Sequence, residues 1–329
     1  KVPANGVGDG TQLTADGKVL RWDGIPSSDG TRLAHFDKDQ QLWVYDIASR
    51  TNKRIAECDE GDFSDVTWSP DGKWLSFRDN ARALWRLELE GGTATRVDQE
   101  PIYGVFPTLR HAWSSDSRWI AYTRMERSHF KRVYLHDVAA GASHALTDGL
   151  SDAAEPVFDA GGKYLYLAAS TDAGPFNTWF SQASADIEQT NELYVVVLGK
   201  DTPSPFAKES DEEKSKAPAE EKDDEAEKKE EKPATPSTNI DLAGLAQRIV
   251  AFPLAPAYYS NLVPGAEGQL YYLKTVRLPF TGEDPEALKA QLCRFDLTER
   301  EEKVLLGGVQ GFQLSDDHEK ALLRMEGGW

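Results

Sequence analysis

The chain has 329 residues, which is enough for two ordinary domains or for one large repeat domain. Its 37 Lys and Arg residues and 55 Asp and Glu residues give a net charge of −18 at pH 7, which argues against nucleic acid as a partner. The sequence lacks the run of about 18 apolar residues that a membrane helix needs, and its two cysteines, Cys58 and Cys293, lie too far apart to indicate a disulfide framework or a metal site.

One pattern recurs along the chain: an aromatic or apolar residue, a short turn rich in Ser, Asp and Gly, a basic residue, and an alternating apolar strand. Its clearest copy is Val-Thr-Trp-Ser-Pro-Asp-Gly-Lys-Trp-Leu-Ser-Phe at residues 66–77. Other copies occupy residues 25–34, 112–122, 157–167, 263–273 and 313–323. The first four turns recur every 42 to 45 residues, at Asp29, Asp71, Asp116 and Gly161. Such a period indicates a structural repeat.

Two further strands follow each copy of the pattern. The first of them is expected at residues 41–47, 83–87, 132–138 and 291–297. A short outer strand is expected at residues 53–56, 95–97, 144–147, 248–252 and 302–305. Four strands in about 42–45 residues are typical of a β-propeller blade. A single blade buries neither of its faces, whereas blades stacked around an axis bury both.

The sequence therefore predicts an all-β fold, a β-propeller of four-stranded blades. About six blades are present, and we expect a truncated seven-bladed propeller because the closing strands are missing. The expected blades span residues 12–56, 57–98, 99–148, 149–253, 254–306 and, incomplete, 307–329. Large aromatic side chains should fill the spaces between blades: Trp68, Trp74, Trp113 and Trp119.

One segment differs sharply in composition from the repeats. Residues 208–232 hold 12 acidic residues and 7 lysines with almost no apolar side chains. Such a composition cannot offset the entropy of folding, so we predict a disordered charged insertion over residues 208–239 of the fourth blade. It should hang from the outer rim as a solvated loop. A tail that docks a protein partner is the alternative interpretation.

The sequence carries no nucleophile elbow of the Gly-x-Ser-x-Gly type and no zinc-binding motif, so it predicts no catalytic residue, no metal and no cofactor. One set of polar residues does suggest binding. Each of them stands three residues before the aromatic residue of its unit, or before the equivalent of that residue. The residue immediately before the aromatic is apolar in most units. This contrast predicts a polar ring at the mouth of the central channel that contacts an extended peptide. Its members are Asp23, Asp65, Arg110, Glu155 and Asn261.

The Trp-Ser-Pro-Asp-Gly-Lys repeat resembles the TolB-type propeller unit. Residues 16–27, residues 200–207 ahead of the charged insertion, and residues 240–253 resemble the second, seven-bladed propeller of tricorn-like serine proteases. In that family two propellers precede a PDZ domain and a serine peptidase core. The resemblance implies that this chain is a non-catalytic fragment of a peptidase, and that it filters or channels peptides.

The same resemblance implies a set of partners. They are peptides or unfolded polypeptide, the downstream PDZ and peptidase domains of the same chain, and, as an option, further copies in a homo-oligomer. Nucleic acid and membrane are not expected, and the cytoplasm is the expected compartment, with the periplasm as the alternative. Two other functions stay open: a non-enzymatic TolB-like scaffold for protein–protein interaction, and the propeller of a prolyl-oligopeptidase-type enzyme.

Overall fold

The structure, a computed structural model, describes residues 7–15, 17–57, 63–102, 108–171, 190–208, 236–275, 290–315 and 317–328, without the side chain of Asp23. Within this part the chain forms five four-stranded sheets and one two-stranded sheet. Strand order in each sheet follows the sequence, and every neighbouring pair of strands is antiparallel. Hairpin connections of this kind give the sequential blades that the repeat predicts.

The first three sheets lie before residue 150. The first contains β1 (Arg21–Pro26), β2 (Arg32–Asp37), β3 (Gln41–Asp46) and β4 (Thr51–Glu57). The second contains β5 (Phe63–Trp68), β6 (Trp74–Asp79), β7 (Ala83–Glu88) and β8 (Thr95–Gln99). The third contains β9 (His111–Trp113), β10 (Trp119–Met125), β11 (Lys131–Asp137) and β12 (Ala142–Ala145).

The remaining sheets follow in the same way. The fourth contains β13 (Asp152–Phe158), β14 (Tyr164–Ser170), β15 (Glu192–Val197) and, after the 3-10 turn η1 (Leu245–Arg248), β16 (Ile249–Ala251). The fifth contains β17 (Tyr258–Pro264), β18 (Gln269–Thr275), β19 (Gln291–Asp296) and β20 (Glu301–Gly307). The last contains β21 (Gly311–Leu314) and β22 (Ala321–Arg324).

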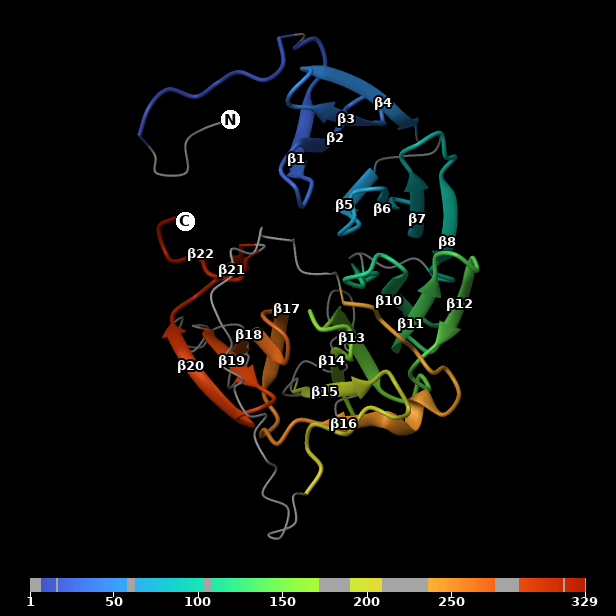
Figure 1. Ribbon diagram of the computed structural model, residues 1–329, viewed down its shortest axis with the longest axis vertical. Coiled ribbons are helices and arrows are strands. Elements are labelled where there is room, and N and C mark those ends of the chain that lie inside the picture. Colours follow the sequence, from blue (N-terminus) through green and yellow to red (C-terminus); the bar gives the residue numbers. More distant parts are fainter. Residues whose placement is uncertain are drawn as a thin grey trace, which may run out of the picture.

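The sheets are arranged around a ring, with β1, β5 and β17 nearest the centre and β4, β8, β12 and β20 at the outside (Figure 1). This arrangement confirms the expected all-β propeller of four-stranded blades, and we number the blades 1 to 6 in chain order. In the described part of the chain, no helix has the length and apolar character needed to cross a membrane.

The cores lie between consecutive blades. One buried cluster joins blades 1 and 2, and further clusters join each following pair up to blades 5 and 6. Trp68 and Trp113 are buried, and each indole N–H donates a hydrogen bond to the preceding blade, to Ile25 O at 2.9 Å and to Ser76 Oγ at 2.8 Å. Trp119 is also buried between blades, which confirms the position predicted for these aromatics.

The Ser-x-Asp-Gly turns connect the blades a second time, at one end of the inner strands. In blade 2, Ser69 Oγ donates to Asp71 Oδ1 at 2.6 Å, and the amide of Asp71 donates to the hydroxyl of Ser117, in the next turn, at 3.0 Å. Gly72 has φ +67°, a left-handed conformation that glycine adopts without strain. The turn of blade 2 is therefore fixed both by its own side chains and by the turn of blade 3.

The end of the charged insertion lies over these turns. Thr238 is completely buried, and its amide donates to Asp116 Oδ2, in the turn of blade 3, at 2.8 Å. It also lies above the blade 4 turn, where a Cβ at Gly162 would stand 2.9 Å from the Thr238 hydroxyl. The insertion predicted over residues 208–239 thus returns across the turn face and not simply at the rim. Its residues 209–235 lie outside the described residues.

Candidate functional site

The innermost strands share a backbone irregularity at the predicted polar positions. The register with the second strand shifts within β1, β5, β13 and β17. In three of these strands the shifted residue has a left-handed backbone: Asp65 (φ 51°), Glu155 (φ 52°) and Asn261 (φ 54°). These are β-bulges, in which an extra residue in the left-handed region bends the strand and redirects a side chain. Asp23 occupies the equivalent stretch of β1, and its side chain lies outside the described part.

Arg110 lies in the same region but not within a bulge. It precedes β9, the shortest inner strand, and its amide donates to Thr123 Oγ1 of β10 at 2.8 Å. Its guanidinium lies 3.4 Å from Asp65 Oδ2 of the preceding blade, and Asp65 also binds the buried Arg78 at 2.6 Å. Asp65 therefore orients the exposed Arg110 side chain.

The other two bulge residues hold the blade that follows. Glu155 Oε2 accepts a hydrogen bond from the amide of Leu262, in blade 5, at 2.9 Å. Asn261 Nδ2 donates to Phe312 O, in blade 6, at 3.3 Å. Polar residues on the inner strands thus form hydrogen bonds between successive blades around the centre of the ring.

Two cavities lie on either side of Arg110. The first, of about 360 Å³, is lined by Ile25, Asp65, Val66, Thr67, Arg110 and His111. The second, of about 190 Å³, is lined by residues of blades 3, 4 and 5: Thr108, Arg110, Lys131, Asp152, Ala154, Glu155, Ala168, Ser170, Asn191, Tyr258 and Tyr259. The structure therefore brings Asp65, Arg110 and Glu155 together, whereas the exposed Asn261 lines neither of these cavities.

Sequence reasoning missed several residues of the second cavity. The amide and the ammonium of Lys131 both donate to the Asp152 carboxylate at 2.8 Å, so these two residues form one closed unit. Asn191 is held by two hydrogen bonds to the backbone of Tyr259. These residues stand at strand ends in different blades, and no sequence signal marked them, because their contacts form only after the blades have packed.

Burial perturbs the ionisable groups of this region. It raises the pKa of the Glu155 carboxyl, against the opposing effect of the amide of Leu262 and the charge of Arg110. It lowers the pKa of His111 to about 4, and both ring nitrogens of His111 are buried without a hydrogen-bond partner among the described residues. His111 therefore lines the first cavity as a neutral imidazole at neutral pH.

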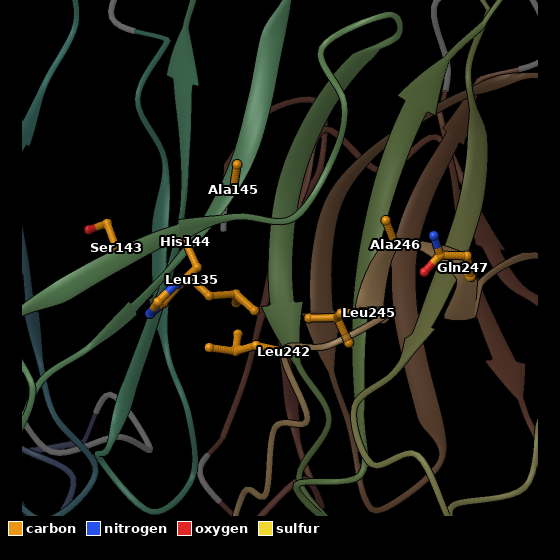
Figure 2. Close-up of a pocket in the computed structure, with 9 residues that line it drawn as sticks. Leu135, Ser143, His144, Ala145, Leu242, Leu245, Ala246 and Gln247 are labelled. Carbon is orange, nitrogen blue, oxygen red and sulfur yellow. The ribbon is translucent and has the colours of Figure 1, made fainter.

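A third cavity lies at the outer rim, away from the polar ring. It measures about 540 Å³ and lies between β12 and the segment that leads into η1. Figure 2 shows Leu135, Leu242 and Leu245 gathered there, with His144 beside them. It contains none of the five predicted site residues.

Comparison with known proteins shows the family to which the chain belongs. Residues 76–328 match the family model for the tricorn protease second beta propeller domain. The chain belongs to this tricorn propeller family. Tricorn protease homolog 1 of Streptomyces coelicolor is 26% identical over 286 residues, which cover 84% of this chain and 25% of the relative. The tricorn propeller described here thus spans about a quarter of the length of that relative.

Solved structures agree on the fold. A crystal structure of the tricorn protease superposes with a TM-score of 0.67 and 18% identity, over 91% of this chain and 28% of that one. A TolB-like protein of Agrobacterium tumefaciens superposes with a TM-score of 0.51 and 14% identity, over 88% of this chain and 81% of that one. At these identities both matches bear on the propeller fold alone, which tricorn and TolB-like proteins share.

Proposed function

We propose that this propeller binds and channels extended peptides for a tricorn-type serine peptidase whose catalytic residues lie outside the chain. The observation that carries the proposal is the position of Arg110, which lines both cavities beside the inner-strand bulges. An extended peptide offers backbone carbonyls and side chains in alternation, and exposed polar side chains on neighbouring blades can bind them in turn.

The proposal includes the partners and the compartment that the family suggests. PDZ and peptidase domains of the same polypeptide would receive the peptide, and a homo-oligomer would place several propellers around one peptidase assembly. An acidic chain with two cysteines suits the cytoplasm.

The test is peptide binding to the chain carrying Arg110→Ala. We expect the affinity for a fluorescein-labelled ten-residue peptide, measured by fluorescence anisotropy, to fall by about ten-fold, because one charge-assisted hydrogen bond is removed. Arg118→Ala is the matched control. Arg118 is also half-exposed and also lies 3.4 Å from a carboxylate, but on the turn at the other end of β9.

The control variant should bind as the unmodified chain does. Equal losses of peptide affinity in the two variants would mean that net charge alone attracts the peptide. An unchanged affinity in Arg110→Ala would refute the proposed peptide channel.

A further inference from the structure

The first cavity, of about 360 Å³, is lined by an ion pair that joins two blades. Asp65 of blade 2 and Arg110 ahead of blade 3 both line it, and their Oδ2 and Nη1 atoms lie 3.4 Å apart. This contact uses only part of each side chain. Among the residues that the structure describes, Asp65 Oδ1 and the other N–H groups of the Arg110 guanidinium have no hydrogen-bond partner. The cavity wall therefore presents a free acceptor next to free donors.

The charges around this wall are balanced. Asp65 Oδ2 also lies 2.6 Å from the buried Arg78, so one carboxylate serves two guanidinium groups. The second positive charge, on Arg110, is offset by Glu155 in the cavity on its other side. A ligand carboxylate would therefore meet the like charge of Asp65, and a ligand ammonium would meet the like charge of Arg110. An uncharged group that both donates and accepts hydrogen bonds meets neither.

The rest of the lining adds one polar group and no further charge. The hydroxyl of Thr67 makes a single hydrogen bond within the described part of the chain, a long one of 3.5 Å to the backbone oxygen of Asp65, so its lone pairs are free to accept. The other lining residues are Ile25, Val66 and the neutral His111. The bulge at Asp65, with φ 51°, is of the kind that redirects side chains next to binding sites.

We propose that this cavity binds the primary carboxamide of a glutamine or asparagine side chain in an extended peptide. The proposal rests on the peptide-binding function proposed above and names the side chain that one of its subsites recognises. A primary carboxamide carries its oxygen and one N–H on the same side of a planar group, so it can accept from Arg110 and donate to Asp65 at once. Its second N–H can donate to Thr67 Oγ1. A backbone peptide group fits less well, because its trans geometry directs the C=O and the N–H in opposite directions.

The size and position of the cavity agree with a side chain as the ligand. Its volume of about 360 Å³ lies at the lower end of the range of about 300–1,000 Å³ that is usual for small-molecule sites. Its lining comes from β1, β5 and the start of β9, the inner strands of three successive blades. Because β1 and β5 lie nearest the centre of the ring (Figure 1), a peptide held there can insert one side chain into the cavity.

The experiment measures how four alanine–glycine nonapeptides displace the fluorescein-labelled peptide from the unmodified chain. They differ only in the central residue, which is glutamine, glutamate, methionine or lysine. An acetylated N-terminus and a C-terminal N-methylamide leave no charge and no primary carboxamide at either end. We expect the glutamine peptide to bind about ten-fold more tightly than each of the others, a difference of about 1.4 kcal/mol. Glutamate loses the N–H donors and adds a charge next to Asp65, and methionine leaves Asp65 and Arg110 without hydrogen bonds.

Arg110→Lys keeps the positive charge beside Asp65 and removes the planar set of N–H donors, so it should remove most of the preference for glutamine over methionine. Arg118→Lys is the matched control and should retain the whole preference, because Arg118 lies 3.4 Å from a carboxylate on the turn and outside the cavity. Thr67→Val should weaken the glutamine peptide and leave the methionine peptide unchanged. The comparison of the four peptides on the unmodified chain needs no variant, so it decides the matter even where a variant fails to fold.

Two results would overturn the inference in distinguishable ways. If the four peptides bind equally tightly, or one of the other three binds best, while Arg110→Ala still weakens the labelled peptide, the carboxamide site is refuted and the peptide channel stands. If neither the labelled peptide nor any of the four binds, the proposed channel is refuted together with its subsite.

Discussion

Two ion pairs in this chain have the same length and very different surroundings, so they test how burial determines the worth of a charge pair. Arg82 and Glu100 are 2.5 Å apart with side chains 8% and 1% exposed, and Lys303 and Glu299 are 2.5 Å apart with side chains 42% and 47% exposed. Glu100 additionally accepts hydrogen bonds from Thr108 Oγ1 and the amide of Met125, which joins the end of blade 2 to blade 3.

We expect Glu100→Gln to lower the free energy of unfolding by about 3 kcal/mol, because Gln keeps neutral hydrogen bonds but leaves the buried guanidinium of Arg82 without its anion. This is the lower end of the cost of about 3–5 kcal/mol for breaking a buried pair. Glu299→Gln should cost less than about 1 kcal/mol, since solvent screens an exposed pair of the same length.

The assay is equilibrium unfolding in guanidinium chloride, followed by tryptophan fluorescence and by far-UV circular dichroism so that two-state behaviour is checked. A third variant, Arg82→Met combined with Glu100→Gln, should recover part of the loss, because it removes the unpaired buried charge and keeps an acceptor for Thr108 and the amide of Met125. Equal costs for the two glutamate variants would refute the reasoning, as would a double variant less stable than Glu100→Gln.

Three further outcomes are expected. Gly162→Ala should cost about 1–2 kcal/mol more than Gly30→Ala, because both glycines have a left-handed φ but only the new methyl at 162 collides with the returning insertion end; thermal unfolding of both variants checks this. Trp113→Phe should cost about 1–3 kcal/mol, measured by chemical denaturation, because it removes the indole hydrogen bond to Ser76 across blades 2 and 3. The pKa of His111 is about 4 in the folded chain and ordinarily 6.5, so the unfolded chain binds more protons between these pH values. The free energy of unfolding should therefore fall as the pH drops from about 6.5 to 4. The fall should be smaller in His111→Gln.

The blade architecture was predictable because the residues of each repeat determine its own turn and strands. The turn Ser69-Pro-Asp71-Gly72 specifies both ends of a hairpin, through a hydroxyl, a carboxylate and a glycine with positive φ. Contacts between blades were predictable only in kind. The size of Trp68 and Trp113 predicts that they fill the spaces between blades. The groups that accept hydrogen bonds from their indole N–H depend on how two sheets pack, so the sequence does not predict them.

The polar ring was predicted from an alternation that a regular strand would not produce. Asp65 and Thr67 are two residues apart, so in an unbroken strand they would share one face. The bulge between Ser64 and Thr67 inserts an extra residue, so the two side chains no longer share one face: Asp65 is exposed and Thr67 is half-buried. The sequence contrast was therefore a sign of the bulge itself. Lys131 and Asp152 carried no such sign, because their pairing exists only after blades 3 and 4 have met.

The inner-strand bulges hold neighbouring blades together. A left-handed Glu155 is unfavourable by itself, and it is held in place by the amide of Leu262 from the next blade. Blade 5 thus fixes the position of a carboxylate on blade 4, in the way that Asp65 of blade 2 pairs with Arg110 ahead of blade 3. Asp65, Glu155 and Asn261 each contact a neighbouring blade, so this arrangement of polar side chains can form only when the blades have packed around the axis.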